Sequence, residues 1–595
     1  MSWIITPTPA EERLIKAATE GTIADYSDHS SADAVVNDPA QGERWGSERT
    51  IRAEIIYALA VGTNPRWHVH AKGVQLAGAN IVGGLDFQGA KISCPLVFVN
   101  CYVGQPIILV DATAPTISLY GSYVKTVVAF RFVTLGSVLL YRGFAVIEGV
   151  ELDDAKIGGN LDCEGGSFYN FSGPAISADG LQVQGSVYMR ARRLGASSSP
   201  FLANNEVRLL GAHIRGDLDC SGGLFEASNG RALSADRLVV DGEVCLRNGF
   251  RANGEVRLLG GQFRGNLDCA QSVFFNPGGT ALNGDSLSVG QVLLWHGFQA
   301  RGSVRLVGSR INGDLNCTGG SFCAEKTPDN PHGLALTIDR AEIQELFLRG
   351  VAQPSKGSVS VAYARVRLLN DDLESWPTAG RSWLDGFVYD TIAAPASTHA
   401  RERLDWLNRQ PTDRFWPQPY EQLVLVLRRM GHERDARKIA IAKQRASRKR
   451  GELGPGAFIW NLILGASVGH GYRSWLAIIW MLLFIAVGTA VFSEAKQLGI
   501  IAPAHENTYQ PMTSNEFGAP GKEVGQPDFQ PLLYSIDVLL PFVDLHQKSS
   551  WWLYPRKPRD WAYVGCEFYF LGHLILGWLL TGLLVAALAG IIKKD

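Results

Sequence analysis

Four cysteines of this 595-residue chain recur in nearly identical surroundings, and regularly placed thiols could carry redox chemistry or bind a soft metal. Each of them ends a Leu-Asp-Cys or Leu-Asn-Cys triplet: Cys163, Cys220, Cys269 and Cys317. Cys220 and Cys269 are 49 residues apart, and Cys269 and Cys317 are 48 apart. The triplets lie in copies of one longer motif, VRLLGAHIRGDLDCSGGLF, which begins at Val207, Val256 and Val304, with a looser copy at Val150. A fixed period of this length indicates a repeat architecture.

The triplets themselves predict where the thiols lie. Strand alternation sends the leucine and the cysteine to one face and the intervening Asp or Asn to the other. A β-helix coil takes roughly twenty-odd residues, so each copy should span two coils. Cysteines two coils apart would be separated by about 10 Å, which exceeds the Cα separation of about 7 Å that a disulfide allows. We therefore expect a column of small buried side chains, with no cysteine-bound metal and no redox centre.

Columns of polar residues offer further alternatives. Asn160, Asp217, Asn266 and Asp314 could bind calcium, but they lack the glycine-rich nonapeptide spacing of calcium-binding β-rolls, and turn formation explains them. His68 and His70 alternate as strand neighbours and would need a third metal ligand, which the sequence does not place nearby. Basic columns could bind an anionic surface, although interspersed acids favour a solvated face: Arg208, Arg215, Arg257, Arg264 and Arg305, with Arg310 displaced.

The sequence divides into four regions. Two helices, one capped by Thr8 and one over Ser47–Gly62, should cover the first coil within residues 1–72. Short apolar pairs separated by turn residues predict solenoid repeats over residues 73–369. Residues 370–456 combine an aromatic connector with a basic helical hairpin that turns at Gly431, and residues 457–595 form a membrane region. The predicted fold class is mainly β: a right-handed β-solenoid with short N-terminal helices, a helical hairpin and a C-terminal two-helix membrane region.

Composition limits the classes of function. Lys and Arg number 56 against 57 Asp and Glu, so no basic face supports dedicated nucleic-acid binding. Nine Cys without a CxxC pair fit a reducing compartment, and the N-terminus lacks the pattern of a secretion signal. The chain has no GxGxxG motif after a strand, no P-loop, no haem or iron-sulfur spacing and no nucleophile elbow. We therefore predict no cofactor and no catalytic residue.

Two apolar stretches are long enough to span a membrane, at about residues 475–492 and 574–592. Basic residues precede the first and follow the second, and the positive-inside rule then places both of these ends, together with the solenoid, in the cytoplasm. The expected location is the cytoplasmic membrane, crossed twice. Six basic residues are expected to contact lipid headgroups: Arg445, Arg448, Lys449, Arg450, Lys593 and Lys594.

The loop between the two stretches contains the segment PLLYSIDVLLPFVDLHQ. Residues 531–541 could form a re-entrant helix, the layout of a channel pore, or an interfacial helix anchored by nearby tryptophans. No Thr-Val-Gly-Tyr-Gly filter is present. In the first alternative, five ionisable side chains would form a pore or another functional membrane site: Asp537, Asp544, His546, Glu567 and His573.

Three stretches are similar to a known group of proteins: GVQLAGANIVGGLDFQGAKI from Gly73, PQPYEQLVLVLRRMGHERDAR from Pro417 and YSIDVLLPFVDLHQ from Tyr534. They resemble bacterial, largely actinobacterial, proteins that join a pentapeptide-like solenoid to two C-terminal spans and are often labelled membrane-associated oxidoreductases. The resemblance implies this layout over nearly the whole chain and, through the label, an oxidoreductase activity.

Three functions are compatible with the sequence. The leading hypothesis is a membrane-anchored cytoplasmic solenoid that acts as a scaffold for another protein, because long stacked faces suit extended recognition. The second is an oligomeric channel or transporter-like module whose solenoid is a regulatory domain. The third is the oxidoreductase that the family label implies, although the missing catalytic motifs disfavour an enzyme. Membrane lipids and either a protein partner or further copies of the chain are the expected partners.

Overall fold

The computed structural model describes residues 6–29, 34–194, 197–352, 357–449, 454–504, 528–557 and 560–589. They form two compact units, Met1–His432 and Glu433–Asp595. The first unit contains the solenoid, and the second contains the long apolar helices. The predicted fold class, a mainly β solenoid with helices, is confirmed.

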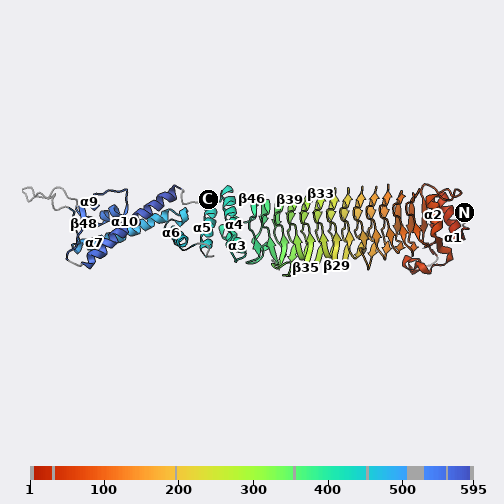
Figure 1. The fold of residues 1–595 in the computed structure, drawn as a ribbon, viewed down its shortest axis with the longest axis horizontal. Coiled ribbons are helices and arrows are strands. Elements are labelled where there is room, and N and C mark those ends of the chain that lie inside the picture. Colours follow the sequence, from red (N-terminus) through yellow and green to blue (C-terminus); the bar gives the residue numbers. More distant parts are fainter. Residues whose placement is uncertain are drawn as a thin grey trace, which may run out of the picture. The chain divides into compact units, whose positions relative to one another are not determined.

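The first regular turns of the solenoid are each built from four short strands, and in later turns two of these strands merge into one longer strand. In one turn, β13 (Val133–Thr134) and β14 (Val138–Leu139) belong to one sheet, while β15 (Ala145–Val146) and β16 (Val150–Glu151) belong to the other. Each strand pairs in parallel with its counterpart in the next turn, as β14 does with β18 (Leu161–Asp162). About 13 such turns stack into the two long parallel sheets shown in Figure 1.

The repeated motif occupies two turns. In the register, Leu218 of β28 (Leu218–Asp219) is paired with Val244 of β31 (Val244–Cys245), which is paired in turn with Leu267 of β34 (Leu267–Asp268). Leu218 and Leu267 are the equivalent leucines of two successive copies, and one complete turn lies between them. The two-coil interpretation of the 49-residue period is therefore confirmed.

A column of phenylalanines fills one part of the solenoid core. Neighbouring rings have centroids 5.2 to 5.5 Å apart and are tilted against one another, a favourable arrangement for aromatic pairs. The members of this phenylalanine column, one in each successive turn, are Phe144, Phe168, Phe201, Phe225, Phe250, Phe274, Phe298 and Phe322. Each ring after Phe144 therefore packs against the ring of the turn before it.

The N-terminal residues extend the first turn of the solenoid. Helix α1 (Pro9–Glu20) has the predicted capping box, in which Thr8 and Glu11 exchange hydrogen bonds. The second predicted helix is shorter than expected. The chain first forms β2 (Thr50–Arg52), which pairs with β4 (Asn80–Val82), and only then α2 (Ala53–Val61). Pairing with the sheet satisfies the backbone of these residues, so the helix starts later.

Parallel pairing continues beyond residue 369. Strand β44 (Arg365–Asp371) pairs with β46 (Val388–Ile392), and helices α3 (Ala400–Leu407) and α4 (Pro417–Arg429) follow. Gln422 of α4 donates a hydrogen bond to the backbone carbonyl of Tyr389 in β46 (2.6 Å). Helix α4 therefore covers the last turn.

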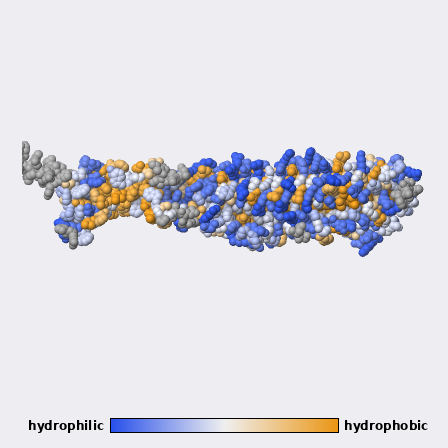
Figure 2. All heavy atoms as spheres, viewed as in Figure 1, coloured by the Kyte–Doolittle hydropathy of each residue, from blue (hydrophilic) through white to orange (hydrophobic). Residues whose placement is uncertain are grey.

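The second unit is helical. Its helices are α5 (Glu433–Lys449), α6 (Pro455–Ser467), α7 (Trp475–Gln497), α8 (Pro531–Leu539), α9 (Gln547–Ser550) and α10 (Trp561–Leu588). A short antiparallel pair, β47 (Ile501–Pro503) and β48 (Trp551–Leu553), connects the end of α7 to the region before α10. Helices α7 and α10 have 23 and 28 residues, are long and apolar enough to cross a membrane, and contribute to the hydrophobic surface in Figure 2.

Candidate functional site in the helical unit

The repeated cysteines form a buried column in the solenoid. Cys163, Cys220, Cys269 and Cys317 are at most 1% exposed. In the intervening turns the register places larger apolar side chains at the same position: Met189, Leu246 and Leu294. Burial raises the pKa of Cys317 to about 12 and the pKa of each of the other three thiols well above its usual value. Reactive thiolates are therefore disfavoured in this column.

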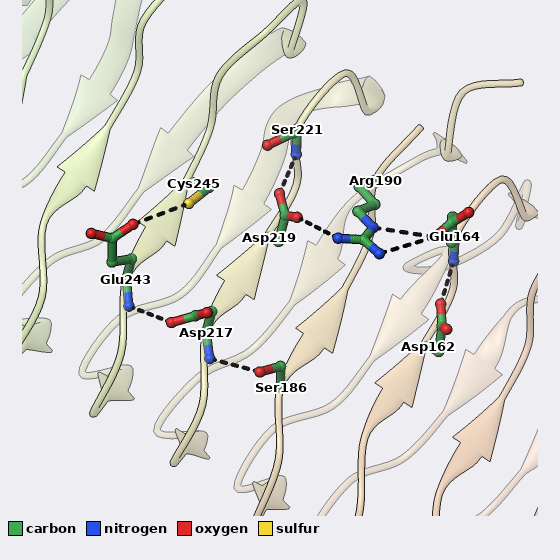
Figure 3. A network of polar contacts seen from close by, with 9 residues as sticks. All are labelled: Asp162, Glu164, Ser186, Arg190, Asp217, Asp219, Ser221, Glu243 and Cys245. Atoms are coloured by element: carbon green, nitrogen blue, oxygen red, sulfur yellow. Dashed lines mark hydrogen bonds and ion pairs between the residues drawn. The ribbon is translucent and has the colours of Figure 1, made fainter. Parts of the chain in front are cut away.

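The outward acids form hydrogen bonds within the solenoid. Figure 3 shows the backbone N–H of Glu243 donating to Asp217 (2.8 Å) across neighbouring turns. It also shows Arg190 between Glu164 and Asp219, with an N–O distance of 3.1 Å to each. Within the described residues, no group of three or more His, Cys, Asp or Glu side chains could hold a metal ion.

The basic columns of the solenoid are paired with acids. Arg257 lies 2.8 Å from Asp236, and Arg305 lies 2.6 Å from Asp285, in each case an acid from the adjacent turn. The same kind of pairing joins further members of the columns: Arg208 with Asp179, Arg264 with Asp241 and Arg310 with Glu342. Much of the positive charge of these columns is therefore neutralised within the solenoid.

Helix α8 lies between the two apolar helices. At its start, the ring of Tyr534 lies 4.9 Å from that of Phe492 in α7 and 6.5 Å from that of Phe570 in α10. At its end, Leu539 packs in one apolar cluster with Met481 of α7 and Leu580 of α10. From the start of α8 to its end, the contacted residues come earlier in α7 and later in α10. Helix α8 therefore runs antiparallel to α7 and parallel to α10.

A buried polar contact joins the three helices. The side chains of Ser535 in α8 and His573 in α10 are within hydrogen-bonding distance (3.2 Å), and the Ser535 hydroxyl also donates to the carbonyl of Ile485 in α7 (3.1 Å). Tyr569 Oη lies 3.4 Å from the other ring nitrogen of His573. A Cβ at Gly488 would lie 2.2 Å from the Ser535 hydroxyl, so this close approach requires glycine.

Asp537 fixes the chain that follows α8. Its two carboxylate oxygens accept hydrogen bonds from the backbone N–H groups of Leu545 (3.1 Å), Gln547 (2.9 Å) and Lys548 (2.8 Å). The side chain is buried, at 7% exposure. Asp537 therefore holds the 540–548 segment folded back toward α8, and its carboxylate oxygens face backbone donors.

The remaining predicted membrane residues lie apart from this buried contact. Asp544 Oδ1 and His546 Nδ1 lie 3.1 Å apart, and these two side chains are 74% and 77% exposed. Phe542, just before them, has its ring 6.5 Å from that of Trp578 in α10. Glu567 is exposed on the first part of α10. The structure thus brings His573 to Ser535 and Asp537 to the 540–548 segment, but it does not gather all five predicted residues into one site.

The basic residues predicted to contact lipid fall into two groups. Arg445 and Arg448 of α5 line a small cavity in the helical unit, and Lys449 is exposed at the end of α5. Arg450, Lys593 and Lys594 lie outside the residues that the structure describes.

Two features escaped the sequence analysis. Helix α10 starts at Trp561 and not near residue 574. The Asp560 side chain caps this start by accepting a hydrogen bond from the Ala562 backbone N–H (3.3 Å). The apolar run from Trp561 to residue 574 is interrupted in the sequence by Glu567, so the predicted span began too late. The basic cavity also includes His470 and Arg473, which are separated from α5 in sequence. The available signal was the GHGYR sequence at Gly469, since two glycines around a histidine indicate an irregular turn.

Comparisons with protein-family models, with curated proteins and with solved structures found no match. The β-solenoid and the two candidate membrane helices agree with the layout expected from the resemblance.

Proposed function

We propose that this chain is a membrane-anchored solenoid protein that acts as a cytoplasmic scaffold for another protein. The observation that carries the proposal is the combination of about 13 stacked turns with a second unit containing two exposed apolar helices. A stack of turns presents a long fixed surface for recognition. Apolar helices of this length, with many exposed large hydrophobic side chains, are suited to a bilayer.

A cleft on the solenoid gives the scaffold a place for a partner. It has a volume of about 350 Å³ and lies between chain segments that project beyond the regular turns, in β35 (Val273–Asn283) and after β40 (Ser321–Cys323). Phe275, Arg301 and Glu325 line it, so apolar, basic and acidic groups are all available within one cleft. Aromatic residues and arginine, both present in this cleft, are enriched at protein-recognition surfaces.

Site-specific photo-crosslinking in native membranes tests the scaffold proposal. A photoreactive residue replaces Phe275 in the cleft or, as the control, Val133 on the other sheet; these side chains are 39% and 37% exposed. We expect one discrete adduct from position 275 and none from position 133. The absence of any adduct, or the same adduct from both positions, would contradict a partner that binds at the cleft.

A second candidate function, ion conduction by several copies of the chain, is favoured by α8. If α7 and α10 span the bilayer, α8 enters between them and its C-terminal end lies among their apolar residues, as in a re-entrant pore helix. The exposed side chains of Asp544 and His546 would then lie at membrane depth, where a charge costs about 3 kcal/mol or more unless protein or water surrounds it. A water-filled path between copies would supply that environment.

Ion flux into proteoliposomes tests the second candidate. We expect cation flux from the full chain, a strong reduction in Asp544→Asn and no change in Asp390→Asn, an exposed acid of β46. Absence of flux from the full chain would exclude ion conduction, and only the scaffold proposal would remain. Equal flux in the two variants would show that Asp544 does not line the path.

A further inference from the structure

A small cavity with a basic lining lies at the start of the first apolar helix. Its volume is about 80 Å³. Arg445 and Arg448 reach it from α5, Arg473 from the residues before α7, and His470 from the short turn between α6 and α7. Three arginines from two distant parts of the sequence therefore converge on a space large enough for a phosphate group and too small for a nucleotide.

These arginines differ from the other basic residues of α5. Earlier in the helix, Arg437 pairs with Glu433 (3.2 Å) and Lys438 pairs with Asp435 (3.1 Å). Among the described residues that line the cavity, none is an Asp or a Glu. Guanidinium groups gathered without a counter-charge repel one another, and a bound anion would relieve that repulsion.

His470 completes the cavity with a neutral polar group. Its side chain is buried, at 7% exposure. Burial, together with the nearby Arg448 and Arg445, lowers the pKa of His470 to about 4. A neutral imidazole adds no further repulsion and can donate an N–H to an anionic oxygen.

Glycine keeps this space open. A Cβ at Gly465 of α6 would lie 3.1 Å from His470 Nε2 and 3.8 Å from Arg448 Nη1. Any larger side chain at this position would extend toward the polar atoms that line the cavity. Gly465 therefore provides a way to block the cavity without removing a charge.

The apolar surface beside the cavity indicates the source of the anion. Helix α6 exposes large hydrophobic side chains, among them Phe458, Trp460 and Ile463, and α7 begins with the exposed Trp475. Tryptophans at the start of an apolar helix are typical of the bilayer interface. The cavity thus lies where phospholipid headgroups are expected, next to a surface on which acyl chains can lie.

We propose that this cavity binds the phosphate of an anionic phospholipid, with Arg445, Arg448 and Arg473 as its ligands and His470 as an additional hydrogen-bond donor. Arginine is suited to this role because its planar fork matches two phosphate oxygens. The acyl chains lie along α6 and α7. The inference rests on the membrane anchoring in the proposed function, and it holds whether the protein acts as a scaffold or conducts ions.

A thermal-unfolding titration tests the inference. Purified full-length protein in neutral detergent is titrated with short-chain phosphatidylglycerol, and a ligand that binds only the folded state raises the unfolding temperature saturably. We expect Arg448→Gln and Arg473→Gln to weaken the apparent affinity by roughly tenfold or more, the effect of losing a charged hydrogen bond. Arg434→Gln, an exposed position on α5 outside the cavity, should respond like the wild type.

Two comparisons identify the group that binds. Diacylglycerol with the same chains lacks the phosphate and should not stabilise the protein; equal stabilisation would show binding through the chains alone and overturn the proposal. Inorganic phosphate should act far more weakly than the lipid, and an equal effect would assign the cavity to a free anion instead of a lipid.

A blocking variant separates the cavity from general positive charge. Gly465→Leu keeps every arginine, and we expect it to lose the response to phosphatidylglycerol. A full response in Gly465→Leu, or in both arginine variants, would overturn the site. Unfolding temperatures measured without lipid verify that each variant is folded, and any one folded variant is sufficient for the test.

Discussion

Arg403 and Asp371 form a buried bidentate ion pair at the last turns of the solenoid. The Arg403 Nη1 and Nη2 atoms lie 2.8 and 2.7 Å from the two carboxylate oxygens of Asp371, and the indole N–H of Trp376 donates to the same carboxylate (2.8 Å). The side chains of Arg403 and Asp371 are 5% and 1% exposed. Helix α3 is therefore joined to β44 by a pair of charges that is almost entirely buried.

Removing one partner of this pair should be costly. We expect Asp371→Asn to reduce the free energy of unfolding by about 3–5 kcal/mol, because Arg403 would stay buried without its counter-charge. Urea denaturation combined with hydrogen exchange of β46 and α3 measures the loss. The matched control is Asp111→Asn, whose pair with Arg131 is exposed (43% and 55%) and should leave the midpoint unchanged. Equal losses at the two sites would show that burial is not the cause.

Thiol reagents should react with only one cysteine in the folded protein. Eight of the nine cysteines are buried, and Cys323, which lines the solenoid cleft, is the exception. We expect a water-soluble maleimide to add one label to the native chain and nine after denaturation, as counted by mass spectrometry. Cys323→Ser should remove the native label, and Cys220→Ser should retain it. Rapid native labelling of Cys220 would contradict the buried column.

Glycines of α10 should differ sharply in their tolerance of a methyl group. A Cβ at Gly577 would lie 1.8 Å from the carbonyl oxygen of Leu539, whereas a Cβ at Gly582 meets nothing within 4 Å. We expect Gly577→Ala to destabilise the helical unit by about 1–3 kcal/mol, because α8 must move. Gly582→Ala should be neutral or stabilising, since alanine favours helix. Thermal unfolding in detergent compares them, and equal effects would contradict the packing of α8 against α10.

Acid should weaken the helical unit through His470. The folded-state pKa is lowered to about 4 from a usual value of 6.5, so the unfolded state takes up a proton first. The stability due to the neutral imidazole is therefore present above about pH 6.5 and is lost as the pH falls toward 4. We expect His470→Gln to flatten the unfolding profile over this range. Substitution of the exposed His29 should leave the profile unchanged, and a flat wild-type profile would contradict the burial of His470.

Cysteine labelling in intact cells tests the expected topology. In a Cys323→Ser background, we expect a membrane-impermeant maleimide to label Lys557→Cys, which lies before α10, and to miss Arg434→Cys on α5. The reason is the excess of basic residues on the α5 side, which the positive-inside rule places in the cytoplasm. Labelling of position 434 alone would reverse the assignment.

The solenoid could be predicted from the sequence because its determinants are local. The alternation within Leu218, Asp219 and Cys220 fixes which side chains face inward, and the register confirms the two-turn period. The phenylalanine column was missed although its signal is equally local: Phe250, Phe274, Phe298 and Phe322 follow one another at intervals of 24 residues. That interval equals one turn of the solenoid, so it predicts directly that these four phenylalanines stack in a column.

The helical unit was harder to predict because its contacts join distant segments. Nothing near Arg448 in sequence indicates that His470 and Arg473 meet it, since the meeting depends on how α5, α6 and α7 pack. Similarly, Asp537 could be selected as an ionisable residue, but its role in holding the 540–548 segment depends on the chain folding back.

The phenylalanine column makes the length of the solenoid adjustable in evolution. Each ring inside the column contacts one ring before it and one after it, so none of these rings depends on the total number of turns. Deleting residues 219–267 would join Leu218 directly to Asp268, restore a Leu-Asp-Cys triplet and leave the column continuous. Gene duplication or loss in two-turn units can therefore set the distance between the solenoid's two ends without redesigning any interface.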